Sequence, residues 1–122
     1  MKHLNSTLLA VLLAAGLVLG AGAQDKRREA QLRTVRGTVL DKEENPITGG
    51  VVFLKNVRTQ NVRSQYSDDD GKYRFSGLDP NVDYEVHAEH REQTSQRRTV
   101  SSLDGRREII LHLKVDKKKD AG

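Results

Sequence analysis

Short runs in which apolar and polar residues alternate recur along most of this chain, and polar turn clusters separate them. Alternation with a period of two places every second side chain on the same face of a β-strand. Seven runs fit this pattern, at residues 34–40, 49–57, 62–67, 72–76, 83–90, 93–100 and 107–115. Because no helical periodicity stands out between them, the sequence predicts an all-β protein.

The connections between these runs are too short for helical crossovers, which favours antiparallel pairing. Each strand has one face to bury, so we expect two sheets packed face to face, as a seven-stranded Ig-like or transthyretin-like β-sandwich. The alternation assigns all five aromatic rings to the core: Phe53, Tyr66, Tyr73, Phe75 and Tyr84. The polar run at residues 93–100 is the predicted edge strand and the candidate for strand addition, and the alternative is that its charges oppose aggregation.

The amino-terminal segment has the features of an export signal. Lys2 precedes an apolar run of 12 residues, from Leu8 to Leu19, and small residues stand at Ala21 and Ala23. This pattern predicts a helical signal peptide over residues 1–23 that is cleaved after Ala23. The run is shorter than the ~20 residues that span a bilayer, so we expect no stable membrane span after cleavage. An uncleaved anchor is the alternative, and the destination is either the periplasm or the medium.

Composition divides the remainder into three parts and excludes several classes of protein. Residues 24–32 are predicted to be a flexible polar leader, residues 33–115 the sandwich, and residues 116–122 a disordered basic tail. The absence of cysteine excludes disulfide scaffolds, thiolate zinc sites and thiol nucleophiles. Lysine and arginine number 21 against 17 acidic residues, a net charge of +4, but both signs are interspersed, so no nucleic-acid partner is expected.

Two clusters of titratable residues are candidates for chemical sites. In a strand, His87 and Glu89 share one face while His90 points to the other, unlike the helical spacing of a zinc protease motif. Asp68, Asp69 and Asp70 precede Gly71 in a predicted hairpin turn. These three carboxylates are a weak calcium candidate, and a solvated hairpin tip is the alternative. The sequence therefore predicts neither a catalytic set nor a resident cofactor.

Four segments together resemble the carboxypeptidase regulatory-like domain family, whose members are transthyretin-like or starch-binding-like β-sandwich modules. The segments are RGTV at residues 36–39, NPITGGVVFL at 45–54, SDDDGKYRFSGL at 67–78 and YEV at 84–86. The positions that carry the resemblance are Gly37, Pro46, Gly49, Val51, Gly71, Tyr73, Phe75, Leu78 and Tyr84. The sequence departs from the family pattern at Gly50, where the family often has alanine, and at residues 81–83, where it usually has a glycine.

The resemblance implies an exported single-domain member of this family, with no catalytic residues of its own. We expect a noncatalytic binding or structural module of the cell envelope, which contacts a protein through its loops or by strand addition at a sheet edge. A carbohydrate-binding module is the alternative, by analogy of fold. A transthyretin-like hydrolase is the third, although the chain ends in Asp120-Ala121-Gly122 where that hydrolase has a tyrosine-arginine-glycine-serine signature. The partner is thus an envelope protein or a glycan, and the sequence leaves the oligomeric state open.

Overall fold

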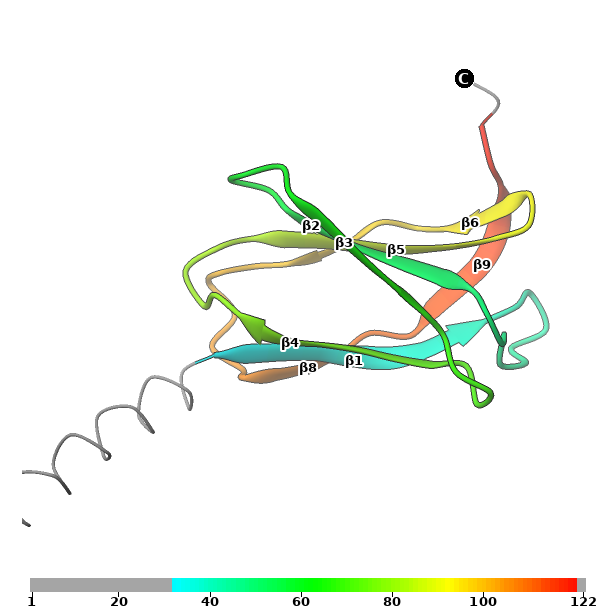
Figure 1. The fold of residues 1–122 in the computed structure, drawn as a ribbon, viewed down its shortest axis with the longest axis horizontal. Helices are drawn as coiled ribbons and strands as arrows, with labels where there is room; N and C mark the ends of the chain where they lie inside the picture. The colour runs from blue at the N-terminus through cyan, green and yellow to red at the C-terminus, as the bar shows by residue number, and fades with distance from the viewer. Residues whose placement is uncertain (1–31, 121–122) are drawn as a thin grey trace, which may run out of the picture. The chain divides into compact units, whose positions relative to one another are not determined.

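A computed structural model describes residues 32–120, and Figure 1 shows its fold. The predicted signal peptide, with Ala21 and Ala23, and nearly all of the predicted leader lie outside these described residues. Within residues 32–120, no helix is long and apolar enough to cross a membrane.

The described residues form nine strands, and the all-β prediction is confirmed. The strands are β1 (Arg33–Leu40), β2 (Val51–Asn56), β3 (Val62–Tyr66), β4 (Lys72–Leu78), β5 (Tyr84–His90), β6 (Gln93–Ser95), β7 (Arg98–Val100), β8 (Glu108–Ile110) and β9 (Leu113–Lys118). The count exceeds the predicted seven because the runs at residues 93–100 and 107–115 are each broken into two strands. Strand β9 also continues to Lys118, so the prediction of a disordered tail from residue 116 was wrong for its first three residues.

The strands lie in two layers. One layer contains β3, β2, β5 and β6, with β7 also paired to β5, and the other contains β4, β1 and β8 (Figure 1). Strand β9 joins the layers, because it pairs with β6 in the first and with the end of β1 in the second. The prediction of purely antiparallel pairing was wrong at β1, which pairs in parallel with both β8 and β9. The result is a sandwich closed along the β9 side.

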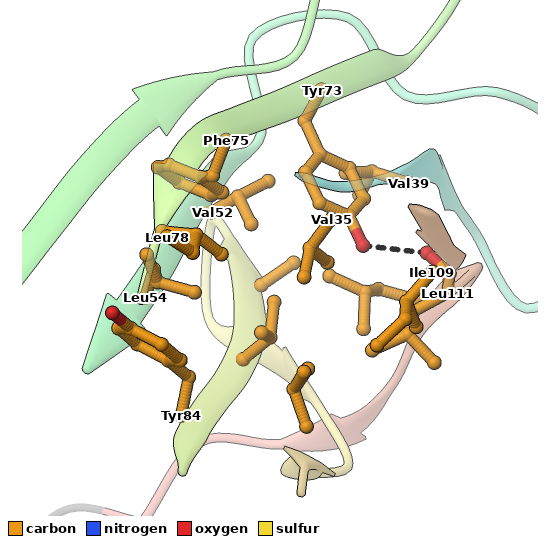
Figure 2. Close-up of a cluster of buried hydrophobic side chains, with 14 of the residues drawn as sticks. Val35, Val39, Val52, Leu54, Tyr73, Phe75, Leu78, Tyr84, Ile109 and Leu111 are labelled. Atoms are coloured by element: carbon orange, nitrogen blue, oxygen red, sulfur yellow. Dashed lines mark hydrogen bonds between the residues drawn. The ribbon is translucent and has the colours of Figure 1, made fainter. Parts of the chain in front are cut away.

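The core lies between the layers, where the predicted alternation places its apolar side chains (Figure 2). Strand β5 illustrates the pattern, since Tyr84, Val86 and Ala88 are buried and the residues between them are half-buried. Among the rings, Tyr73, Phe75 and Tyr84 are in the core, as predicted. The same prediction was wrong for Phe53, which is half-buried on the outer face of β2, and for Tyr66, which is 73% exposed. In β2 the inward positions belong to Val52 and Leu54, so the period of two turns Phe53 outward.

The break between β8 and β9 passes directly over β1. At this β1 crossing, which we define as Gly37, Tyr73 and Leu111, the Leu111 backbone N–H donates to the Arg36 carbonyl oxygen over 2.9 Å. The Tyr73 hydroxyl, on β4, donates to the Leu111 carbonyl oxygen over 2.6 Å, the dashed line in Figure 2. A Cβ at position 37 would overlap that carbonyl group. Glycine at 37 therefore permits the close approach on which this crossing depends.

Three other family positions, Gly71, Pro46 and Gly49, lie in or beside turns. Gly71 has a φ of 75°, and a Cβ there would meet the Pro46 Cβ at 2.9 Å and the Val39 carbonyl oxygen at 3.0 Å. Pro46 forms an isolated bridge with Leu40, outside any central strand. Gly49 has a φ of 74° before β2 begins. These positions thus hold the β1–β2 connection against the β3–β4 turn.

Candidate functional site

Strand β4 ends one side of the strand order, and its free edge is covered by side chains. The Arg74 backbone N–H donates to the Gln65 side-chain oxygen over 2.7 Å, and the Lys72 N–H donates to the Asp68 carboxylate over 2.8 Å. The Arg63 guanidinium donates to the Ser76 carbonyl oxygen over 3.4 Å. Polar backbone groups on an exposed edge invite pairing with another chain. The β4 edge is therefore blunted by groups from β3 and from the following turn.

Strand β3 ends the other side of the strand order, and among the described strands it pairs with β2 alone. The ladder is bracketed by bonds from Asn56 N–H to the Asn61 oxygen and from Ser67 N–H to the Gly50 oxygen. Because bonded and non-bonded pairs alternate in an antiparallel ladder, the backbones of Arg63 and Gln65 bond to β2. The backbones of Val62, Ser64 and Tyr66 then face outward. We call this outward backbone, with the three side chains attached to it, the β3 edge.

The predicted edge strand at residues 93–100 was wrong for its first part. Strand β6 (Gln93–Ser95) lies between β5 and β9 and pairs with both. Strand β7 (Arg98–Val100) pairs with β5 alone among the described strands. Among the polar residues of this run, Ser95 is buried, and its hydroxyl accepts from the Ala88 N–H over 2.8 Å and donates to the Gln96 oxygen over 3.1 Å. A polar run therefore occupies the middle of a sheet because its buried hydroxyl is bonded to the backbone.

The outer face beside the β3 edge carries an aromatic pair. The rings of Phe53 on β2 and His87 on β5 are stacked, with centroids 5.0 Å apart and an interplanar angle of 21°. A hollow of about 340 Å³ lies over this pair and is lined by Phe53, Lys55, Val62, Glu85, His87, Glu89 and Arg97. Val62 is 57% exposed and extends the apolar surface of Phe53 to the β3 edge. An apolar strip thus leads from the sheet face to its open side.

Charged groups flank this strip in pairs of opposite sign. Glu89 accepts from the Lys119 ammonium over 2.6 Å, which holds the pKa of its carboxyl below the usual value. The His87 Nε2 lies 3.4 Å from the other Glu89 oxygen. Burial, followed by the nearby positive charge of Arg97, lowers the pKa of His87, so the ring is neutral at pH 7. The face therefore combines a neutral aromatic centre with ion pairs at its rim.

The structure places the other candidate residues apart from this face. Asp68 uses one carboxylate oxygen to accept from the backbone N–H groups of Asp70 and Lys72, which stabilises the turn before β4. Among residues 32–120, no group of three or more histidine, cysteine, aspartate or glutamate side chains is arranged to hold a metal ion. The calcium candidate at Asp68, Asp69 and Asp70 is thus a turn tip with its first carboxylate already engaged. His112 lies beside β1, where its Nδ1 accepts from the Thr38 N–H over 3.2 Å.

Comparison with known proteins identifies the family. The sequence matches the carboxypeptidase regulatory-like domain over residues 34–114, which is more than half of the chain. The chain belongs to the carboxypeptidase regulatory-like domain family. The resemblance noted at Gly37, Gly71 and Tyr73 is therefore confirmed, and these residues hold the crossing and the turn described above. No curated protein sequence matches the chain.

Solved structures share this fold at low sequence identity. A streptococcal ancillary pilin aligns with a TM-score of 0.55 at 14% identity, over 73% of this chain and 33% of its own. The major pilin subunit of Bacillus cereus aligns with a TM-score of 0.55 at 15% identity, over 72% of this chain and 31% of its own. Catechol 1,2-dioxygenase from Pseudomonas arvilla C-1 aligns with a TM-score of 0.54 at 11% identity, over 74% of this chain and 53% of its own. This chain thus spans about a third of the pilins and half of the dioxygenase, and the likeness concerns the fold alone.

Proposed function

We propose that this chain is a noncatalytic, exported module of the cell envelope that binds a protein through the β3 edge. The observation that carries the proposal is the contrast between the two ends of the strand order. Side chains cover the β4 edge, whereas three outward backbone units and two exposed apolar side chains remain at the β3 edge. An open edge of this kind adds a strand from a partner, with the backbone supplying affinity and alternate side chains supplying specificity.

Several further observations support this reading. The family to which the chain belongs includes accessory modules of exported proteins, as the sequence resemblance implies. The fold also occurs in two pilins, which are proteins of the cell surface by their names. The apolar strip from Phe53 to Val62 and Tyr66 gives an incoming strand something to pack against. A core filled by apolar side chains leaves the surface as the place for recognition.

The test is recovery of partners from cells that express the full chain with a carboxy-terminal tag. Brief crosslinking of the envelope fraction should recover a protein partner from the wild type and much less from a Tyr66→Lys variant, which places a charge on the β3 edge. A Leu103→Lys variant is the matched control, because Leu103 is exposed in the loop after β7, away from β3. Equal recovery by all three proteins would overturn the proposed surface. Export is checked separately, since the recovered chain should begin at Gln24.

A glycan is the second candidate partner, because the stacked pair of Phe53 and His87 offers an aromatic surface with Glu85 and Arg97 beside it. Small-molecule sites combine apolar and aromatic side chains with a few polar groups that fix the orientation of the ligand. Retention of the wild type on a polysaccharide panel, and its loss in a Phe53→Ala variant, would favour this candidate. Turnover in a hydrolase screen that disappears in a His87→Gln variant would contradict the noncatalytic part of the proposal.

A further inference from the structure

The β3 edge lacks most of the features that usually prevent strand addition. Natural edges are protected by proline, lysine, bulges or inward-pointing charges. Strand β3 contains neither proline nor lysine, and its pairing with β2 runs in register from Val62 to Tyr66 without a bulge. Its one charged side chain, Arg63, turns inward and lies 5.5 Å from the centre of the Phe75 ring. The outward backbone of β3 is therefore available for pairing, and the Arg63 guanidinium lies over β4 instead.

The sequence of this edge is complementary to itself. We propose that β3 pairs antiparallel with β3 of a second copy of the chain, about a two-fold axis at Ser64. The outward backbone of Val62 then meets that of Tyr66 in the other copy, and Ser64 meets Ser64. Three outward residues on each strand exchange about six backbone hydrogen bonds in this register. The inference rests on the proposed function for its choice of edge, and it names the strand that fills it.

The side chains agree with this register on both faces. On the outer face, Val62 lies opposite Tyr66, an aliphatic and aromatic pair of the kind that stabilises cross-strand contacts. On the inner face, Arg63 lies opposite the neutral Gln65, so no two like charges stand directly opposite one another. Phe53 lies beside Ser64 on the neighbouring strand β2, so the apolar strips of the two copies become continuous across the axis. A closed two-fold contact of this kind uses the same patch on both copies.

A foreign strand would fill the edge less specifically. A foreign strand running antiparallel to β3 would have to place one suitable side chain opposite the aromatic ring of Tyr66 and another opposite Val62. A second copy supplies both in the required order and at the same concentration as the first. The paired strands are short, so the contact belongs to the weak class of interfaces. We expect half of the chains to be dimeric at a concentration on the order of 100 µM, which corresponds to a weak association constant.

The test measures oligomeric state by sedimentation velocity over a concentration series. Wild-type protein should shift toward the dimer at the upper end of the series. Ser64→Lys alone and Ser64→Glu alone should each remain monomeric, because each places two like charges opposite one another at the axis. An equimolar mixture of the two variants should restore the dimer and should contain one chain of each kind. Each variant should keep the wild-type urea midpoint, since Ser64 is exposed.

Matched controls carry the same charges elsewhere. Gln96→Lys and Gln96→Glu alter an exposed side chain between β6 and β7, and both should dimerise like the wild type. A wild-type chain that stays monomeric throughout the series would overturn the inference. Dimers formed by Ser64→Lys alone, or a mixture that stays monomeric, would also overturn it by excluding this register. The two tests can also disagree. If Tyr66→Lys loses the crosslinked partner but the wild-type chain is monomeric at every concentration, the proposed function is supported and the dimer is not.

Discussion

The β1 crossing and the β3 edge are two solutions to the same problem of satisfying backbone groups. At the crossing, Gly37 lets the chain approach closely, and the buried Tyr73 hydroxyl bonds to the Leu111 carbonyl oxygen. At the β3 edge, the backbone of Val62, Ser64 and Tyr66 faces outward beside exposed side chains. Buried groups need an internal partner, whereas exposed groups are paired by water or by another chain. The comparison assigns folding stability to the crossing, and the open backbone of the edge agrees with the role in recognition that we propose for it.

Gly37→Ala should have the largest effect on folding, because it strikes the crossing directly. The new Cβ would overlap the Leu111 carbonyl group, and the β8–β9 connection would have to move away from β1. We expect the free energy of unfolding to fall by about 3 kcal/mol or more, at the upper end for overpacked sites. Urea unfolding at equilibrium measures the change.

Gly105→Ala is the control for this substitution. An added Cβ at Gly105 would meet no described atom within 4 Å, so the free energy of unfolding should change by less than about 0.5 kcal/mol. A stable Gly37→Ala variant with the same midpoint as Gly105→Ala would show that the crossing is not needed for stability.

Tyr73→Phe tests the hydrogen bond at the crossing rather than the close approach. The substitution keeps the ring in the core and removes the hydroxyl that donates to the Leu111 carbonyl oxygen. Leaving that oxygen without this donor should cost about 1–3 kcal/mol of unfolding free energy. Tyr66→Phe is the matched change at the β3 edge, and because Tyr66 is exposed we expect almost no loss. Equal losses in the two variants would contradict the assignment of stability to the crossing.

Gln65→Ala should have a smaller effect, and it makes the β4 edge resemble the β3 edge. The substitution removes the acceptor of the Arg74 N–H, which is exposed to water, so we expect a loss of about 0.5 kcal/mol. Amide hydrogen exchange at Arg74 should become faster as its bond is lost. The Lys72 amide is an internal control, because its acceptor is Asp68 and should be unaffected. Unchanged exchange at Arg74 would mean that Gln65 does not cover the β4 edge.

The sequence predicted the parts of this fold that depend on local patterns. Alternation placed Tyr84, Val86 and Ala88 inward, and the Asp-Gly pair marked the turn in which Gly71 has a positive φ. These features follow from the strand period and from the backbone conformation of a short turn. A local pattern is sufficient wherever the buried face is set by immediate neighbours.

The rest depended on contacts between distant residues. The break at Leu111 lies within a regular alternation and arises because the chain must cross Gly37, 74 positions earlier, at the β1 crossing. The prediction of an edge strand was wrong for β6 because Ser95, although polar, is buried with its hydroxyl bonded to the backbone. The signal for the β3 edge in the sequence was the polarity of Arg63, Ser64 and Gln65 between Val62 and Tyr66. A strand with polar residues at these positions has little apolar surface to bury.

His87, on the face beside the β3 edge, should give the smallest effect and a dependence on pH. Its pKa is lowered in the folded chain from 6.5, first by burial and then by Arg97. The unfolded chain therefore binds the proton more readily, so the stability that the neutral ring contributes is present above pH 6.5 and is lost as pH falls toward the folded pKa. The urea midpoint should fall between about pH 7.5 and about pH 5.5, where histidine titrates and carboxylates do not. A His87→Gln variant should show a smaller fall, and an equal fall would mean that this ring does not carry the pH dependence.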